Sequence, residues 1–305
     1  MPRHSHFSVF SVAALGALLF AVVLTGNAAA QVQSLTAAEL TRFTPQNPFE
    51  RFPDGRPKVP DKLVDTIRDM ALEVEEAFGL LRQKGYTNQY EANWKVLVPE
   101  KRLVGRAFTV QFMPTRPDLA EAAQKLADEN KVGRLRNQTA IDMLQSGDVA
   151  VVDLFGKIEG GTFVGDKLAY YVQKTTGTGL VVDGALFYLQ RLQKTGMPAY
   201  YRGTHPSSLT NVILSGINVP VRIGDAIVMP GDIVLGDRDG ILFIPPQLVE
   251  EVIQSALTQR ARDEWVKAKL ATGRYKSSEI YGRPSDPALA KELDEFIKQR
   301  TMKKQ

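Results

Sequence analysis

The chain has 305 residues, no cysteine, and 38 Lys and Arg against 34 Asp and Glu, which gives a formal net charge of +4. Its hydrophobic fraction of 44% and charged fraction of 24% exclude a disordered, collagen-like or polytopic membrane chain. The lack of cysteine excludes a disulfide scaffold, a Cys-ligated zinc or iron–sulfur site, and thiol catalysis. No basic run accompanies the small positive charge, so we expect no nucleic-acid partner.

The first thirty residues are typical of a secretory signal peptide. Arg3 precedes residues 7–24, which carry no charged side chain, and Ala28-Ala29-Ala30 supplies a small-x-small cleavage site. We expect cleavage after Ala30, a periplasmic or secreted product, and no stable membrane anchor after cleavage. The alternative is a retained anchor helix, because the apolar run just reaches the length that spans a bilayer.

Composition and periodicity divide the chain into four segments. These are a signal peptide (1–30), an N-terminal arm and helix (31–102), a main α/β domain (103–250) and a C-terminal helical extension (251–305).

The N-terminal arm is predicted to be a loop followed by one helix. Residues 31–60 contain five prolines, too many for a helix or a central strand. Residues 61–84 have helical spacing of apolar side chains, with Asp61 as the N-cap and Gly85 as the terminator. Aromatic side chains of the loop are expected to hold it against the body: Phe43, Phe49 and Phe52.

The main domain begins with a strand and continues as alternating strands and helices. The strand is predicted over 103–113, and the first two helices over 118–131 and 136–145. Short β-type runs separated by turn residues follow, with helices at 166–174 and 187–194 and a β-rich meander thereafter. Further helices are predicted over 246–272, across the boundary between the main domain and the extension, and over 287–300. The later β-runs are 149–154, 179–182, 198–201, 219–223, 226–229, 233–235 and 241–244.

Common catalytic motifs are absent from this sequence. It has neither a GxSxG nucleophile elbow nor a Walker loop, and His205 is the only histidine after residue 30. A multi-histidine metal site is therefore excluded, and we interpret His205 as structural. Residues 177–179 form a turn rather than a dinucleotide loop, because they precede a strand. Residues 236–240 lack the ligand spacing of a calcium loop and predict a hairpin turn.

The glycine-rich stretch at 160–168 is the strongest candidate for a binding site. Its glycines lead into a predicted helix start at residues 165–168, where free backbone N–H groups suit a carboxylate or phosphate. Asp166 can accept hydrogen bonds from water on a hard cation. The alternative is that Asp166 is simply the helix N-cap.

The order of several motifs resembles the RraA-like family. This family includes the regulator of ribonuclease activity A and divalent-metal-dependent 4-hydroxy-4-methyl-2-oxoglutarate aldolases. The resemblance covers residues 103–250 and implies an α/β, swivelling β/β/α domain, here with helical N- and C-terminal extensions. It also implies a homo-oligomer, trimer or hexamer, with sites between subunits. The N-terminal pieces look like a secreted branch. The motifs are GDVAVVDLFG, GGTFVGD, GLVVDGA, MPAYYRG, INVPVRIG and PGDIVLGDRDGILFIPP.

The resemblance also implies where the site residues fall. Active members share a Gly-Asp/Glu turn, a spacer of twenty residues and then an Arg-Asp pair. Here Asp166 supplies the turn, residues 167–186 are the spacer, and the pair is replaced by Phe187 and Tyr188. Asp166 would hold a metal through water, and Tyr188 stands where the direct metal ligand is expected. The implied substrate-binding residues are Gly165, Asp166, Lys167, Leu168 and Phe187 in place of the clamping Arg.

These replacements bear on the chemistry that the resemblance implies. The cofactor would be Mg²⁺ or Mn²⁺, a Lewis acid that stabilises the enolate formed on C–C cleavage. A phenol, with a pKa of about 10, is a poor ligand for such ions, and Phe cannot pair with a carboxylate. Arg191 or Arg202 could replace the missing Arg. An acidic residue from another subunit, Asp263 or Glu264, could add a ligand.

Two functions therefore remain open. One is a metal-dependent lyase that performs retro-aldol cleavage or decarboxylation of a pyruvyl-containing oxo acid, such as 4-hydroxy-4-methyl-2-oxoglutarate or oxaloacetate. The alternative is a catalytically altered or inactive homologue that binds a small molecule in the periplasm. A ribonuclease regulator is disfavoured by the signal segment, and a methyltransferase by the absence of an adenosyl-cofactor loop.

Overall fold

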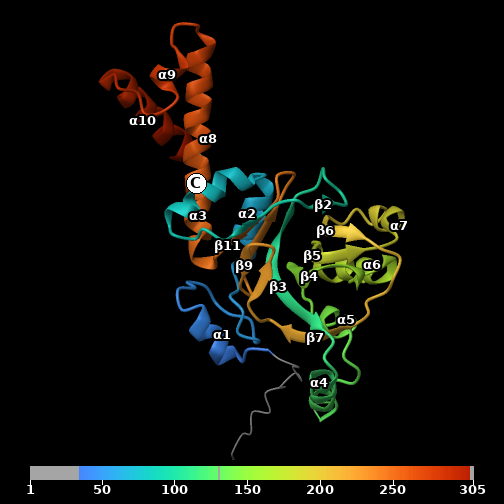
Figure 1. Cartoon of the computed structure of the whole chain (residues 1–305). Helices are drawn as coiled ribbons and strands as arrows, with labels where there is room; N and C mark the ends of the chain where they lie inside the picture. The colour runs from blue at the N-terminus through green and yellow to red at the C-terminus, as the bar shows by residue number, and fades with distance from the viewer. Residues whose placement is uncertain (1–33, 130, 303–305) are drawn as a thin grey trace, which may run out of the picture.

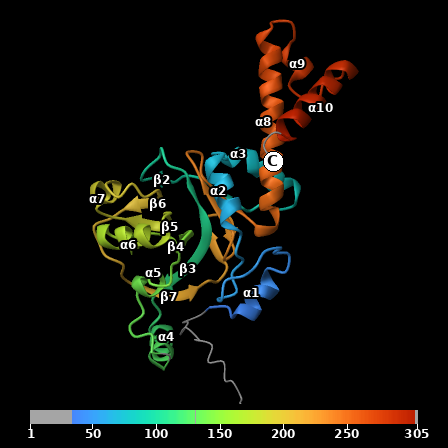
Figure 2. The ribbon, with the colours of Figure 1, turned by 180° about the vertical axis from the view of Figure 1, so that it is seen from behind.

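The computed structural model describes residues 34–129 and 131–302 (Figures 1 and 2). The predicted signal peptide, 1–30, lies outside the described residues. Among the helices that are described, none combines the length and apolar character needed to cross a bilayer.

A mixed sheet of nine strands forms the centre of the protein, in the order β1-β11-β10-β3-β4-β5-β6-β2, with β7 paired to β3. The pairs β3–β4, β4–β5 and β5–β6 are parallel, and the flanking pairs are antiparallel. Strands β8 (Val221–Ile223) and β9 (Ala226–Val228) form a separate ribbon. The sheet strands are β1 (Tyr90–Glu91), β2 (Lys95–Val96), β3 (Leu103–Pro114), β4 (Asp148–Thr162), β5 (Leu180–Leu186), β6 (Ala199–Thr204), β7 (Val212–Ile217), β10 (Ile233–Gly236) and β11 (Ile241–Ile244).

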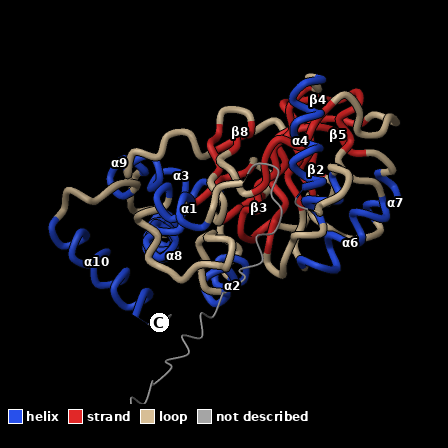
Figure 3. The backbone as a smooth tube through the Cα atoms, turned by 90° about the horizontal axis from the view of Figure 1, so that it is seen from below, coloured by secondary structure: helices blue, strands red, loops and turns tan. Residues whose placement is uncertain are grey.

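The helices lie on both sides of this sheet (Figure 3). Helices α2, α3 and α8 pack together and against β3 and β11, whereas α6 and α7 cover the β4–β6 region. The α/β fold class with helices at both termini is confirmed. The helices are α1 (Ala37–Phe43), α2 (Asp61–Asp69), α3 (Val74–Gln83), α4 (Pro117–Glu129), α5 (Asn137–Ile141), α6 (Asp166–Thr176), α7 (Leu189–Gln193), α8 (Val249–Ala271), α9 (Ser277–Ile280) and α10 (Pro287–Met302).

Strand β4 shows how alternating side chains build the core. Ala150 and Val152 point into the core beneath α6, whereas Val149 and Val151 pack with the β8–β9 ribbon. Because both faces of the sheet are covered here, residues 149–152 are all apolar rather than alternating with polar residues. It extends to Thr162, beyond the predicted end at residue 154, and its register shifts after Asp153, where Phe155 has a φ of 45°.

The single helix predicted over 61–84 is wrong. The chain forms α2 and α3, separated by Ala71, whose φ of 48° is incompatible with a continuous helix. Apolar spacing continues across the break, because both helices bury one face in the same core. Asp61 as N-cap is also wrong. Pro60 occupies that position, and Asp61 is the first helical residue, ion-paired with Arg106.

The prediction that 31–60 is entirely loop is wrong as well. Helix α1 begins at a capping box in which Thr36 and Glu39 exchange hydrogen bonds with each other's backbone. Phe43 does not anchor this segment, since its side chain is 59% exposed, although Phe49 packs against the core of α2, α3 and α8. The buried anchor is Arg56, whose guanidinium contacts Asp54 at 2.7 Å and Asp148 at 2.8 Å.

The C-terminal helices form an arm that projects from the body (Figures 1 and 2). The first half of α8 packs in the body through Val249, Val252 and Ile253. Its second half packs with α9 and α10 in a separate small core centred on Trp265 and Leu293. The predicted helices over 246–272 and 287–300 correspond to α8 and α10, and α8 is preceded by a short 3-10 turn.

Candidate functional site

The glycine loop joins the end of β4 to the start of α6. Phe163 and Val164 are buried, and the Phe163 N–H donates to the carbonyl of Ala185 at 3.2 Å, which ties the loop to β5. Gly165 is the N-cap of α6 and, having no side chain, leaves the first N–H groups without a side-chain acceptor. The alternative interpretation of Asp166 as N-cap is wrong, because Asp166 is the first residue inside the helix.

The aromatic pair after β5 meets this loop. The rings of Phe187 and Tyr188 stack with centroids 4.3 Å apart and an interplanar angle of 30°. A Cβ on Gly165 would lie 2.9 Å from Cε1 of Phe187, so the loop and the ring approach as closely as only glycine allows. Tyr188 has a φ of 56°, a left-handed conformation at the N-cap of α7. The fold therefore brings together four predicted positions: Gly165, Asp166, Phe187 and Tyr188.

Arg191, on the first turn of α7, completes the cluster. Its Nη1 lies 3.6 Å from Oδ2 of Asp166, and its guanidinium carbon lies 4.8 Å from the centroid of the Tyr188 ring. The side chains of Arg191 and Asp166 are 63% and 31% exposed. A pair this exposed and this long contributes little to stability, so an incoming anion can compete for the guanidinium.

A cavity of about 630 Å³ is lined by residues that hydrogen-bond to the same loop, Asn137 and Thr210. Its lining includes Arg134, Arg136 and Asn137, and the Asn137 side-chain N–H donates to the carbonyl of Phe163 at 2.6 Å. The sequence analysis missed these residues, because only the folded chain brings 134–137 beside the loop.

His205 supports the loop from the β6 side. Its Nδ1 lies 2.7 Å from Oγ of Ser207, and that oxygen accepts the N–H of Gly160 at 2.6 Å. The His205 carbonyl also accepts the hydroxyl of Thr162 at 3.2 Å. These contacts agree with the structural role predicted for His205.

Comparison with known proteins identifies the family. Residues 61–243 match the family model described as "RraA-like: Aldolase/RraA". The chain belongs to the RraA-like family. This confirms the resemblance drawn from the motif order.

Sequence relatives of this RraA-like chain carry different names. A protein of Halalkalibacterium halodurans named "Putative 4-hydroxy-4-methyl-2-oxoglutarate aldolase" is 35% identical over 122 residues, which cover 39% of this chain and 56% of the relative. Protein DlpA of Legionella pneumophila is 28% identical over 182 residues, which cover 59% of this chain and 27% of the relative. The chain thus spans little more than half of one relative and about a quarter of the other.

Solved structures agree on the fold. Streptomyces coelicolor RraAS2, described as an unusual member of the RNase ES inhibitor RraA protein family, is 26% identical with a TM-score of 0.57. The match covers 72% of this chain and 99% of that one. An uncharacterized protein from Pseudomonas syringae is 24% identical, with a TM-score of 0.58. The match covers 75% of this chain and 94% of that one, and it shows the fold alone.

Arg202 does not lie free to replace the missing Arg of this RraA-like site. Its guanidinium donates to Asp183 at 2.7 Å, to Glu91 at 2.6 Å and to the Ala92 carbonyl at 2.8 Å. It also stacks 3.7 Å from the centroid of the Trp94 ring. Arg202 is therefore engaged in a partly buried ion-pair network.

The remaining predicted residues lie around or away from the cluster. Lys167 is exposed on α6, and Leu168 packs against the core. Asp263 and Glu264 belong to the projecting half of α8, on the other side of the molecule from α6 (Figure 1). Glu264 is ion-paired with Arg300 of its own chain, and Asp263 is exposed.

The residues around Asp166 in a single chain do not fit Mg²⁺ or Mn²⁺. Such ions prefer several oxygen ligands, with carboxylates foremost. Asp166 faces the cationic Arg191, the neighbouring side chains are Phe187 and Tyr188, and the loop presents N–H donors. Within residues 34–129 and 131–302, no set of three acidic or His side chains gathers at Asp166.

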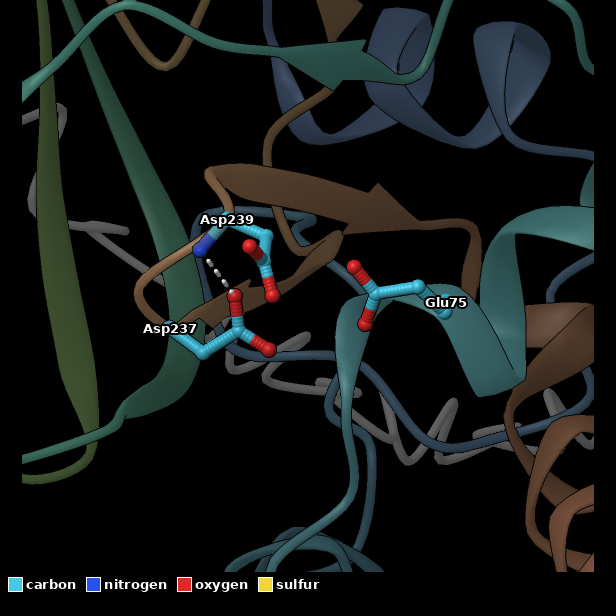
Figure 4. Close-up of side chains that lie close together, drawn as sticks. All are labelled: Glu75, Asp237 and Asp239. Carbon is cyan, nitrogen blue, oxygen red and sulfur yellow. Dashed lines mark hydrogen bonds between the residues drawn. The ribbon is translucent and has the colours of Figure 1, made fainter.

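An acidic group lies instead at the β10–β11 turn, where Asp237 and Asp239 meet Glu75 from α3 (Figure 4). One carboxylate oxygen from each of the three residues lies within 4.8 Å of the other two. Asp237 already accepts the N–H groups of Val74 and Asp239, each at 2.9 Å. Burial raises the pKa of Glu75, and the two aspartates raise it further. The hairpin predicted at 236–240 is confirmed, and Asp237 joins it to α3.

Proposed function

We propose that this RraA-like chain binds a small oxo acid through its carboxylate at the start of α6. The observation that carries the proposal is the position of Arg191, which stands over Tyr188 and faces Asp166. It lies against Tyr188, one of the two positions where the family resemblance places the Arg-Asp pair. Its planar guanidinium can hold a carboxylate with two charge-assisted hydrogen bonds.

The surroundings support a carboxylate as the ligand. The first N–H groups of α6 have no side-chain cap, and helix N-termini favour anions. An incoming carboxylate would take Arg191 from Asp166. The released Asp166 would then be free to accept a hydrogen bond from a ligand hydroxyl or from water. The stacked rings of Phe187 and Tyr188 supply an apolar wall for the carbon skeleton.

A lyase acting on such an oxo acid is the second candidate. It is favoured by relatives from Halalkalibacterium halodurans and Azotobacter vinelandii, both named "Putative 4-hydroxy-4-methyl-2-oxoglutarate aldolase". A bound Mg²⁺ or Mn²⁺ would act as a Lewis acid in that reaction. Because the ligands of one chain do not fit the ion, this candidate requires carboxylates from another subunit of a trimer or hexamer.

The binding proposal predicts a specific loss in an Arg191→Ala variant. The affinity of the chain from residue 31 for pyruvate and oxaloacetate should fall at least about tenfold, since a charged hydrogen bond is worth about 1.5–3 kcal/mol. Isothermal titration calorimetry with a chelator present measures this. Lys194→Ala, at the end of the same helix, is the matched control and should bind as the wild type does. Equal affinity in Arg191→Ala would remove Arg191 from the site.

The lyase candidate is tested separately by pyruvate release. The same protein is mixed with 4-hydroxy-4-methyl-2-oxoglutarate or oxaloacetate, with Mg²⁺ or Mn²⁺, and with or without a chelator. Chelator-sensitive release above the metal-only background would establish lyase activity. Binding without release, from a folded oligomer, would leave the chain as an oxo-acid-binding member of the family.

A further inference from the structure

A second cavity, of about 350 Å³, lies away from α6, beside α1, β9 and β11 (Figure 1). Its volume is at the small end of the range for ligand pockets, about 300–1,000 Å³. Four separate segments of the chain build its wall, so the cavity exists only in the folded protein. The lining residues are Phe43, Thr44, Pro45, Gln46, Tyr86, Gln89, Ile227, Met229, Asp232, Pro245, Pro246 and Gln247.

Asp232 is the acidic group in this lining. Its side chain is 2% exposed, and Oδ2 accepts the N–H of Met229 at 2.9 Å. Oδ1 has no hydrogen-bond partner among the described residues. Burial raises the pKa of Asp232 to about 7, against a smaller opposite effect of the Met229 N–H. No nearby charge contributes to this shift, so the carboxyl lacks a counter-ion.

The rest of the lining is apolar or neutral. Prolines, Phe43, Ile227 and Met229 form the apolar part, and amides and hydroxyls form the remainder. The Gln247 side-chain N–H donates to the Tyr86 hydroxyl at 2.7 Å, which joins two walls of the cavity. No Lys, Arg or His lines the cavity, and Tyr86 is the one other titratable side chain in its lining.

We propose that this cavity binds a small organic ammonium ion, with the charged nitrogen on Asp232 and an apolar body against the prolines and Ile227. We choose a cationic ligand because its charge complements the unpaired carboxyl of Asp232. An anion would meet an acidic group with no cation beside it, and a neutral molecule would gain no ion pair with that group. The site is independent of the oxo-acid site at α6.

Three cyclohexyl probes that differ only in charge test the proposal: cyclohexylammonium, cyclohexanol and cyclohexanecarboxylate. Each is titrated by calorimetry into the chain from residue 31 at pH 7. We expect the ammonium to bind at least ten times more tightly than the alcohol, and the carboxylate not to bind. Binding should also release a fraction of a proton, because burial raises the pKa of Asp232 to about 7. Two buffers of different ionisation enthalpy measure this release.

Two variants locate the binding. Asp232→Asn keeps an oxygen for the Met229 N–H and removes the charge, so ammonium affinity should fall at least tenfold and proton release should vanish. Asp69→Asn makes the same change at an exposed position on α2 and should bind normally. Ile227→Trp leaves Asp232 in place and fills the cavity from β9, where Ile227 is 51% exposed. It should also abolish binding.

Several results would overturn the proposal. These are equal affinities for the ammonium and the alcohol, an Asp232→Asn variant that binds as the wild type does, and preferential binding of the carboxylate. Failure of the folded wild type to bind cyclohexylammonium at millimolar concentrations would equally exclude this site. Because Arg191 plays no part in these titrations, the oxo-acid proposal stands or falls separately.

Discussion

At the scale of single residues, the site at α6 depends on where one guanidinium lies. Asp166 and Arg191 face each other across 3.6 Å, and both are accessible enough for a ligand to separate them. The stacked Phe187 and Tyr188 occupy positions that the family resemblance assigns to an Arg and an Asp. The proposed site therefore offers a cation to an anionic ligand but lacks the carboxylate that the family resemblance places as the metal ligand.

Asp166→Asn separates the two functional candidates. For a binding protein, removing this carboxylate frees Arg191 and should tighten oxaloacetate binding several-fold, because a competing anion is gone. For a metal-dependent lyase, the same change should abolish chelator-sensitive pyruvate release. Calorimetry and the pyruvate assay on one preparation measure both. Asp142→Asn is a control for the loss of one negative charge. Weaker binding in Asp166→Asn would contradict the proposed competition.

Asp232 predicts a pH dependence of stability. Its pKa is raised from 3.8 to about 7 on folding, so the unfolded chain ionises first as the pH rises. Wild-type stability should therefore fall, relative to Asp232→Asn, between about pH 4 and pH 7, by up to roughly 4 kcal/mol. Urea unfolding of both proteins across this range measures the difference. A constant difference between pH 4 and pH 8 would show that Asp232 is not buried as described.

At the scale of secondary-structure elements, the attachment of the N-terminal segment rests on a buried ion pair. The side chains of Arg56 and Asp148 are both fully buried, and Asp148 also accepts the N–H of Gln145 at 2.9 Å. Because Arg56 follows α1 and Asp148 begins β4, the pair joins the N-terminal segment to the central sheet. Removing one partner leaves the other charge uncompensated in the interior.

Arg56→Ala should accordingly destabilise the protein by about 3–5 kcal/mol. Arg68→Ala is the matched control: Arg68 pairs with Asp65 on the surface, with side chains 46% and 55% exposed. Its loss should cost less than about 1 kcal/mol. Equilibrium unfolding in urea compares the two variants. Similar small losses of stability in both variants would mean that Arg56 does not hold the N-terminal segment on the body.

Periodicity predicted most elements because their apolar faces are buried regularly. The strand at 103–113 and the helices at 166–174 and 287–300 were found with small errors at their ends. Strand β7 was missed, because Ser215 and Gly216 interrupt its apolar run and its pairing partner, β3, is distant in sequence. The break at Ala71 was missed because both flanking helices share one core.

At the scale of the whole molecule, the body and the projecting arm have separate cores. Leu293 is fully buried, but its cluster is confined to α8, α9 and α10 and their connections. Leu72 is equally buried, in the core beneath α2, α3 and α8. The body can therefore remain folded when the small core of α8, α9 and α10 unfolds locally.

Leu293→Ala should loosen only the arm. Amide exchange should accelerate across α9 and α10, whereas β3 to β5 should stay protected and the main thermal transition should stay in place. Leu72→Ala makes the same chemical change in the body and should lower global stability by about 2–5 kcal/mol. Hydrogen–deuterium exchange with mass spectrometry distinguishes them. Faster exchange in β3 to β5 of Leu293→Ala would show a single cooperative unit.

Some of the contacts at the two proposed sites form only in the folded chain, so the sequence could not predict them. The meeting of residues 165–166 with 187–188 follows from the spacing of two βα turns, and the motif order was sufficient to expect it. Tyr188 begins the helix of Arg191 in a left-handed conformation, which no sequence pattern indicated. The Asp232 cavity joins Gln46, Tyr86 and Gln247, which no local pattern relates.

The continuity of α8 has a practical use. This helix has 23 residues, which corresponds to about 34 Å of rigid rod whose base is embedded in the body. A fluorophore attached at the outer end of α8 would stand about that distance from the embedded base of the helix. Its fluorescence anisotropy would report whether the α8–α10 arm moves with the body or separately from it.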